Sequence, residues 1–203
     1  MRVLVACEFS GTVRKAFRDR GHDAWSCDVL PSADLGEHMQ ADVLSIIADK
    51  WDLMIAFPPC THLCRAGTRW WPAKIADGRQ RAAINFVLAL AEAPIPQIAI
   101  ENPIGVLSRA WRRADQTIQP HWFRDPWVKT TQLWLKGLPP LRPTNPIEPR
   151  GFWVDNGSLL RRRKYGTTKP ADEGMILAGS TKNALMRSRT FPGMAQAMAS
   201  QWS

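Results

Sequence analysis

Residues 51–67 carry a cysteine at a position where a thiol can act as a nucleophile. A short apolar run at 52–57 is typical of a strand buried on both faces of a parallel sheet, and Pro58 and Pro59 end its pairing because neither has an N–H to donate. Cys60 therefore follows the carboxyl end of a strand, where open α/β sheets bind their ligands. The alternative, for Cys60 taken alone, is a small buried residue at a turn.

A carboxyl group stands at the end of a second predicted strand. Residues 97–100 form an apolar run that leads directly into Glu101 and Asn102. Since the carboxyl ends of parallel strands meet at one edge of a sheet, we expect the thiol of Cys60 and the carboxyl group of Glu101 to face the same substrate.

Residues 1–29 have the order of elements that is typical of a nucleotide-type cofactor site. The order is a strand, a turn ending at Gly11, a helix with Ser10 as its N-cap, and a second strand carrying Asp28. The turn lets backbone amides approach a ligand, and the acid can accept hydrogen bonds from ribose hydroxyls. Only Gly11 stands where a dinucleotide motif has three glycines, so the spacing alone is a weak sign of such a site.

Taken together, these segments resemble those of the DNA cytosine-5 methyltransferases. Residues 58–67 match the pattern PPCxxxxxAG, and residues 101–107 match ENxxGxL. The resemblance extends over residues 1–107 and implies an α/β, Rossmann-like S-adenosylmethionine-dependent methyltransferase fold, with a mixed, mostly parallel sheet and helices on both faces. The long target-recognition domain of the family is missing, as expected of a compact, phage-type enzyme.

The resemblance also implies a reaction. Cys60 would add to carbon 6 of cytosine, which makes carbon 5 reactive enough to take a methyl group from S-adenosyl-L-methionine. Glu101 would hydrogen-bond the ring nitrogen and the amino group, and Asn102 would hold the strand-end loop in shape. A base inside a duplex cannot reach such a pocket, so the DNA must present it flipped out or single-stranded. Cys64, which stands where the family usually has serine, would support the site without being a second nucleophile.

The cofactor site implied by the resemblance begins with the FxG turn. Asp28 matches the ribose-binding acid, and Asp42 matches the acid that contacts the adenine amino group. Val13 and Arg14 depart from the pattern, because further glycines usually stand there. The full set comprises Phe9, Ser10, Gly11, Asp28, Val29, Asp42, Val43 and Pro59.

The substrate-binding residues implied by the resemblance are Pro58, Arg65, Arg69, Lys129 and Thr131. The family's QxRxR segment, whose arginine touches the pyrimidine carbonyl, is replaced at 129–132, where Lys129 or Thr131 is expected to substitute. Residues 68–77 correspond to a mobile loop that closes over DNA, and their basic and aromatic side chains suit that role. The alternative is a solvated loop with its tryptophans folded inward.

Composition bounds the class of protein. The 203 residues include 27 Lys and Arg against 18 Asp and Glu, a net charge of +9 that suits a polyanionic partner such as DNA. The sequence contains no run of about 18 apolar residues, so no membrane span is predicted. The apolar run at the N-terminus is too short for a signal peptide, and we therefore expect a cytoplasmic protein. The four cysteines lack zinc-ligand spacing, which predicts free thiols and no metal.

We expect residues 1–203 to form a single catalytic domain. An irregular basic region is predicted at about 137–190, with its densest charge at 161–164. That charge run is expected to be solvated, with a loop that tracks phosphates as the alternative. The other elements expected are a short helix at 44–50, helices at 78–91 and 194–202, and an antiparallel strand pair at 117–123 and 129–136.

Two other functions stay open at this point. The same scaffold can act on another pyrimidine substrate, such as a free nucleotide or RNA, or add a different one-carbon group. The chain can also be a catalytically silent nucleic-acid-binding module, although the intact Cys60 and Glu101 argue against this.

Overall fold

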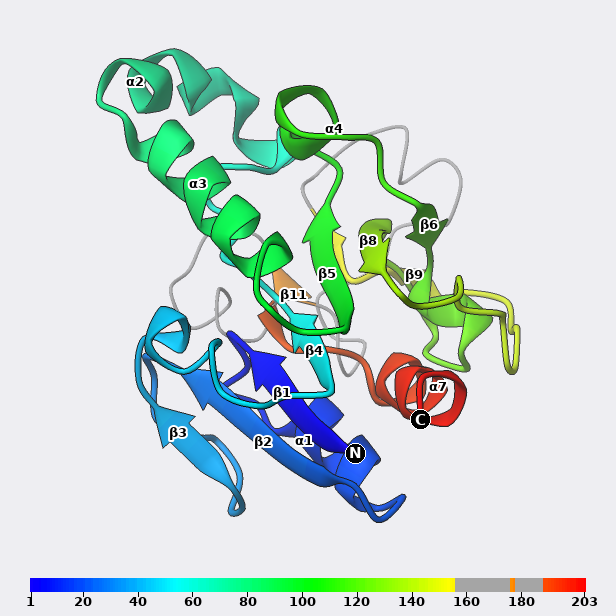
Figure 1. Cartoon of the computed structure of the whole chain (residues 1–203). Coiled ribbons are helices and arrows are strands. Elements are labelled where there is room, and N and C mark those ends of the chain that lie inside the picture. Colours follow the sequence, from blue (N-terminus) through cyan, green and yellow to red (C-terminus); the bar gives the residue numbers. More distant parts are fainter. Residues whose placement is uncertain (156–175, 178–187) are drawn as a thin grey trace.

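The computed structural model describes residues 1–155, 176–177 and 188–203, and its main element is a seven-stranded sheet (Figure 1). The strand order is β3–β2–β1–β4–β5–β8–β6. The strands are β1 (Arg2–Ala6), β2 (Asp23–Asp28), β3 (His38–Gln40), β4 (Leu53–Ala56), β5 (Gln97–Pro103), β6 (Gln116–Ile118) and β8 (Thr131–Lys136). The short pairs β7 (Trp127–Val128) with β9 (Gly151–Phe152) and β10 (Val154–Asp155) with β11 (Ile176–Leu177) lie outside this sheet.

The sheet is mixed and mostly parallel, as the sequence predicts. Strands β1 to β5 are mutually parallel where they pair, whereas β8 is antiparallel to both of its neighbours, β5 and β6. Strand β6 therefore runs in the same direction as β5, and β8 is the one reversed strand of this sheet. The expected antiparallel pair is confirmed, but only one of its two strands runs against the rest.

Helices cover both faces of the sheet. The helices are α1 (Thr12–Arg18), α2 (Trp71–Ala76), α3 (Arg79–Ala91), α4 (Leu107–Ala110) and α7 (Pro192–Gln201), with 3-10 turns η1 (Val43–Ser45), η2 (Arg65–Trp70) and η3 (Pro120–Trp122). Val3 and Val5 of β1 pack with α1 and α7, while Leu4 packs on the other face with α3. Burial of alternate residues on opposite faces explains why these strands read as continuous apolar runs.

The chain order of the strands decides which loops meet. From β1 the chain passes outward to β2 and β3, then returns to add β4 on the other side of β1. The loops after β1 and β4 thus leave adjacent strand ends in opposite directions. Open α/β sheets bind their ligands in the crevice between two such loops. Strand β5 lies beside β4, with Ala56 opposite Ile100, and Glu101 is the next residue of β5, in the same row as Phe57. The strand continues to Pro103, beyond the predicted range 97–100, because residues 101–103 still pair with β8.

Several local predictions are wrong. Residues 68–76 of the stretch 68–77, which was expected as a loop, belong to η2 and α2, and these elements extend beyond the carboxyl end of β5 (Figure 1). Residues 44–50 contain only the end of η1 rather than a helix. The basic run at 161–164 lies outside the described residues, whereas 137–150 is irregular as predicted. In the part of the chain that is described, no helix has the length and apolar character needed to cross a membrane.

The carboxylate of Asp125 anchors α7, so Asp125→Ala should destabilise the fold. Its two oxygens accept hydrogen bonds from the N–H groups of Gly193 (3.2 Å) and Met194 (3.1 Å), two amides at the start of the helix. Loss of this cap should lower the free energy of unfolding by about 1–2 kcal/mol, measured by urea denaturation. Replacing the exposed Asp49 by Ala is the control, and equal effects of the two changes would contradict the capping role.

Candidate active site

The loop after β4 is tied to the end of β5 by a side-chain amide. Asn102 is only 1% exposed, and its Nδ2 donates a hydrogen bond of 2.8 Å to the carbonyl oxygen of Pro58. Pro58 has no N–H, so its carbonyl is the one backbone group that can hold it in place. This hydrogen bond links the end of β5 to the loop after β4 and thereby helps to fix the segment that carries Cys60.

A second connection joins the same two loops through the backbone. Cys64 forms an isolated antiparallel bridge with Gly105, flanked by hydrogen bonds from Arg65 N to Ile104 O (2.8 Å) and from Val106 N to Leu63 O (2.9 Å). A Cβ atom on Gly105 would lie 2.0 Å from the carbonyl oxygen of Leu63. The glycine of the ENxxGxL segment is therefore required by close backbone contact, a role that the sequence did not reveal.

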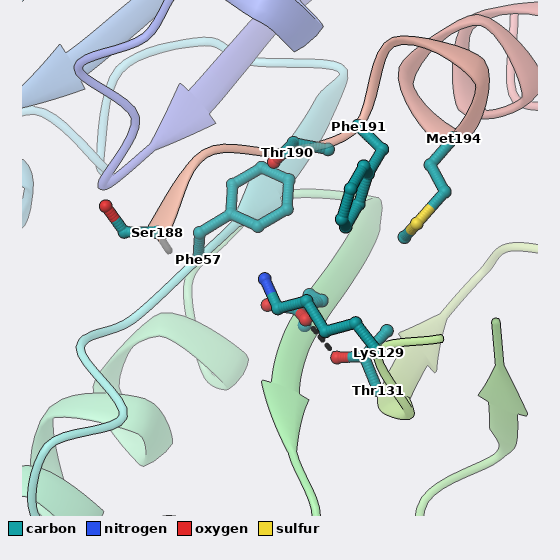
Figure 2. A pocket seen from close by; sticks show the side chains of 8 residues that line it. Phe57, Lys129, Thr131, Ser188, Thr190, Phe191 and Met194 are labelled. Atoms are coloured by element: carbon teal, nitrogen blue, oxygen red, sulfur yellow. Dashed lines mark hydrogen bonds between the residues drawn. The ribbon is translucent and has the colours of Figure 1, made fainter. Parts of the chain in front are cut away.

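Glu101 lines a cavity between the sheet and α7, and Figure 2 shows the side chains that surround this cavity. Thr131, on the neighbouring strand, is 1% exposed and donates its hydroxyl hydrogen to Glu101 Oε1. The Nζ of Lys129 lies 5.7 Å from the ring centroid of Phe191. The cavity is lined by Phe57, Glu101, Lys129, Thr131, Ser188, Thr190, Phe191 and Met194.

Two thiols meet beside this cavity. Cys60 and Cys64 share a hydrogen bond, which is the largest cause of the raised pKa of Cys60. Burial and the charge of Glu101 raise the pKa of Cys60 further, while Lys129 acts in the opposite direction. The hydrogen bond from Cys60 lowers the pKa of Cys64 to about 6. The hydrogen bond thus favours the thiol form of Cys60 and the thiolate form of Cys64.

The turn after β1 is shaped by a buried carboxylate that the sequence analysis did not single out. Glu8 is 4% exposed, and its oxygens accept hydrogen bonds from Val13 N (2.7 Å), Arg14 N (3.2 Å) and the hydroxyl of Ser10 (3.2 Å). Burial raises the pKa of Glu8, and these three hydrogen bonds oppose the rise. The prediction that Ser10 caps α1 is wrong, because the carboxylate of Glu8 takes these amides; Gly11, with φ of 70°, precedes the helix.

The side chain of Arg14 is buried below the turn that follows β1. The Arg14 side chain is buried and donates to the hydroxyl of Ser26 (2.9 Å), and its Nη2 lies 3.5 Å from a carboxylate oxygen of Asp34. A Cβ on Gly11 would lie 2.6 Å from Arg14 Nη2. Arg14 therefore packs beneath the turn and joins α1 to the loop after β2.

The two predicted cofactor acids converge on the end of β1. Burial, and then the charge of Asp28, raise the pKa of Cys7 to about 12, with smaller contributions from Cys27 and Asp42. Each acid also accepts a backbone hydrogen bond, Asp28 from Leu30 N (2.9 Å) and Asp42 from Leu44 N (3.0 Å). Both carboxylates thus lie within electrostatic reach of the Cys7 thiol, which directly follows β1.

The remaining predicted residues are divided between core and surface. Val43 belongs to the core, whereas Val29 is 70% exposed and Pro59 is also exposed. Arg65 and Arg69 are exposed on η2, and neither lines the Glu101 cavity; the guanidinium of Arg69 lies 4.4 Å above the ring of Trp70. The structure thus brings Glu101, Lys129 and Thr131 together and leaves both arginines on a separate surface.

Comparisons with known proteins give likenesses to solved structures alone. No family model matches the chain, and no curated protein sequence matches it significantly. The chain is similar to a solved structure from E. coli, described as a candidate DNA modification methyltransferase encoded within a prophage, at 14% identity and a TM-score of 0.48. The match covers 72% of this chain and 52% of the other, so this chain spans about half of that protein. A likeness of this strength adds nothing to the reasoning from the residues themselves.

The close contact at Gly105 predicts that Gly105→Ala displaces the Cys60 loop. Since the added methyl group meets backbone rather than a flexible side chain, the cost should be at least about 1–3 kcal/mol of unfolding free energy, measured by urea denaturation. Gly67→Ala is the matched control, because a Cβ there meets only ordinary contacts, 3.4 Å from Lys74 Nζ and 3.7 Å from Thr61 O. Equal stability of the two variants would contradict the assigned role of Gly105.

Proposed function

We propose that this chain transfers a methyl group from S-adenosylmethionine to carbon 5 of cytosine in DNA through a covalent adduct on Cys60. The observation that carries the proposal is the placement of Cys60 and Glu101. Cys60 follows β4, and Glu101 lies near the end of the adjacent strand β5. The two segments are joined through Asn102 and Gly105, and the acidic turn after β1 leaves from the strand next to β4.

The thiol and the carboxyl group have complementary roles in this reaction. Addition of Cys60 to carbon 6 converts the ring into an enamine whose carbon 5 is a nucleophile. Glu101 hydrogen-bonds the ring nitrogen and the amino group and thereby supports charge during the addition. Thr131 fixes one oxygen of Glu101 and leaves the other for the base, and Lys129 is the candidate partner of the pyrimidine carbonyl.

The turn after β1 favours a cationic cofactor over a dinucleotide. A pyrophosphate needs free amides at the start of the helix, but Glu8 occupies those of Val13 and Arg14 with a negative charge. That charge suits a sulfonium centre, while Asp28 and Asp42 suit the ribose hydroxyls and the adenine amino group. When bound, S-adenosylmethionine would supply the electrophilic methyl group. The residues proposed to hold it are the predicted set that begins with Phe9, Ser10 and Gly11.

The surface formed by η2, α2 and the start of α3 supports DNA as the substrate. It exposes Arg65, Arg69 and Arg79 together with Trp70, which is 55% exposed. Arginines neutralise phosphates and an exposed indole can stack on a base, so this surface suits a flipped or single-stranded region. These elements extend beyond the carboxyl end of β5 (Figure 1), the strand whose last residues include Glu101 and Asn102.

DNA containing 5-fluorocytosine should trap the protein covalently in the presence of S-adenosylmethionine. Fluorine at carbon 5 cannot leave as a proton does, so the adduct persists and intact mass should report it, mapped to Cys60. Cys60→Ser should give no adduct while keeping cofactor binding. Absence of an adduct on duplex and single-stranded DNA of varied sequence would overturn DNA as the substrate, and fluorinated nucleotides and RNA would then test the other pyrimidine substrates.

Asp42→Ala should weaken binding of S-adenosylmethionine by about tenfold or more. Hydrogen bonds to a charged group contribute roughly 1.5–3 kcal/mol, which corresponds to this loss. Isothermal titration calorimetry measures the affinity, and circular dichroism checks that η1, which Asp42 caps, stays folded. The exposed Asp49→Ala is the control; an affinity unchanged in Asp42→Ala would remove this residue from the site.

A further inference from the structure

A second cavity lies beside the turn after β1, between α1 and α7. Its volume is about 420 Å³, which is within the range of sites that take small molecules. The turn contributes Ser10 and Gly11 to the lining, and the segment before α7 contributes Arg189. The acids Asp28 and Asp42 do not line this cavity, so it forms a separate part of the region around the turn.

The cavity and Asp28 are close enough for one ligand to contact both. In the sheet, Ala6 of β1 is paired with Cys27 of β2. Cys7 and Asp28 come next in the two segments and therefore lie at the same level. From Cys7 to Ser10 the chain advances three residues, which span at most about 11 Å. A nucleoside bound at Asp28 can therefore carry a substituent that reaches the cavity.

The lining of the cavity carries charges of both signs. Lys15 and Arg189 contribute cations, and Asp19 and Asp34 contribute carboxylates. A phosphate group would be repelled by these acids, whereas a zwitterion offers a partner to each sign of charge. S-adenosylmethionine carries an α-amino acid beyond its sulfonium centre, and an α-amino acid is a zwitterion at neutral pH. The cavity therefore suits the amino-acid end of that cofactor.

A carboxylate in this cavity needs a side-chain cation, because the first turn of α1 has no donors to spare. Glu8 accepts the N–H groups of Val13 and Arg14. The guanidinium of Arg14 lies below the turn, where it donates to Ser26 and pairs with Asp34. Neither these amides nor this arginine is thus available to a ligand.

The two cations of the cavity lining differ in their surroundings. Lys15 is paired with Asp19, with Nζ 3.0 Å from a carboxylate oxygen. Arg189 is exposed, and in the part of the chain that is described no acidic side chain forms an ion pair with it. The guanidinium carbon of Arg189 lies 6.0 Å from the ring centroid of Phe9, in the turn itself. Arg189 is therefore the cation placed to meet a carboxylate beside the turn.

The position of Arg189 is set by the start of α7. This helix begins at Pro192, three residues after Arg189. Asp125 accepts a hydrogen bond from the N–H group of Met194, and Met194 belongs to the same core cluster as Val13 of α1. The packing of α7 thus holds the segment that carries Arg189 next to α1.

We propose that the cavity between α1 and α7 takes the amino-acid end of S-adenosylmethionine and that Arg189 binds its carboxylate. The inference rests on the proposed function, because it completes the cofactor site that this function needs. A planar guanidinium can donate two parallel hydrogen bonds to a carboxylate, which fixes the orientation of the ligand as well as balancing its charge. Arg189 is a cofactor-binding residue outside the set predicted from the sequence.

Binding of cofactor analogues to the full chain tests this assignment. Isothermal titration calorimetry compares S-adenosylmethionine with decarboxylated S-adenosylmethionine, which keeps the adenosine and the sulfonium group but lacks the carboxylate. The wild type should bind the complete cofactor at least about tenfold more tightly, as expected of a charge-assisted hydrogen-bonded pair. Arg189→Met should abolish this preference by weakening the binding of S-adenosylmethionine alone. A preference of the same size in Arg189→Met would overturn the proposal.

Two further variants separate binding of the carboxylate from a structural role. Lys15→Met removes the cation that is already paired with Asp19 and should leave the preference unchanged. Arg189→Lys keeps the charge without the planar fork and should restore part of the preference. Equal weakening of both cofactors by Arg189→Met would mean a structural role and contradict the assignment, as would a loss of preference in Lys15→Met as large as that in Arg189→Met.

The two levels of inference fail separately. If the wild type binds neither form of the cofactor, both proposals fail. If it binds S-adenosylmethionine and Arg189→Met keeps the preference, only the role of Arg189 is excluded. If the preference depends on Arg189 but 5-fluorocytosine DNA, nucleotides and RNA give no adduct, the methyl-transfer proposal fails and the assignment of Arg189 stands.

Discussion

The candidate site depends on two contacts that fasten the ends of β4 and β5 to each other. Two consecutive prolines deprive the loop after β4 of N–H groups, so sheet pairing cannot continue into it. The amide of Asn102 instead takes the carbonyl oxygen of Pro58, and Gly105 lets the backbone of Leu63 approach without a Cβ between them. Both contacts are buried or tight, and together they hold Cys60 and Glu101 at fixed places along one sheet edge.

Charge is divided across that edge. The turn after β1 gathers three carboxylates, those of Glu8, Asp28 and Asp42, in a chain whose net charge is +9. The elements η2 and α3, whose exposed residues include arginines, extend beyond the carboxyl end of β5 (Figure 1). A cationic cofactor and a polyanionic substrate would therefore approach Cys60 from opposite directions, each toward charges of the opposite sign.

The thiol pair and the helices around it form one unit. Lys74 and Gln80 reach from α2 and α3 to two successive carbonyl groups of the cysteine turn, at Thr61 and His62. On the other face of the sheet, Phe191 and Met194 of α7 close the cavity of Glu101, and Asp125 fixes the start of that helix. Placement of the reactive groups is thus coupled to helices that are distant from them in sequence.

The sequence by itself determined the order of the strands and the residues at their ends. Apolar runs report burial, which is a local property, so the parallel sheet and the position of Cys60 just past a strand were predictable, whereas β5 continues beyond the predicted end through Glu101 to Pro103. Only the tertiary structure decided the capping of α1 by Glu8 instead of Ser10, the helical state of residues 68–76, the single reversed strand and the pairing of Cys60 with Cys64 beside Lys74. Each of these is set by buried groups finding partners across the fold, as Asn102 does with Pro58, 44 residues away, and no periodicity in the chain encodes such partners.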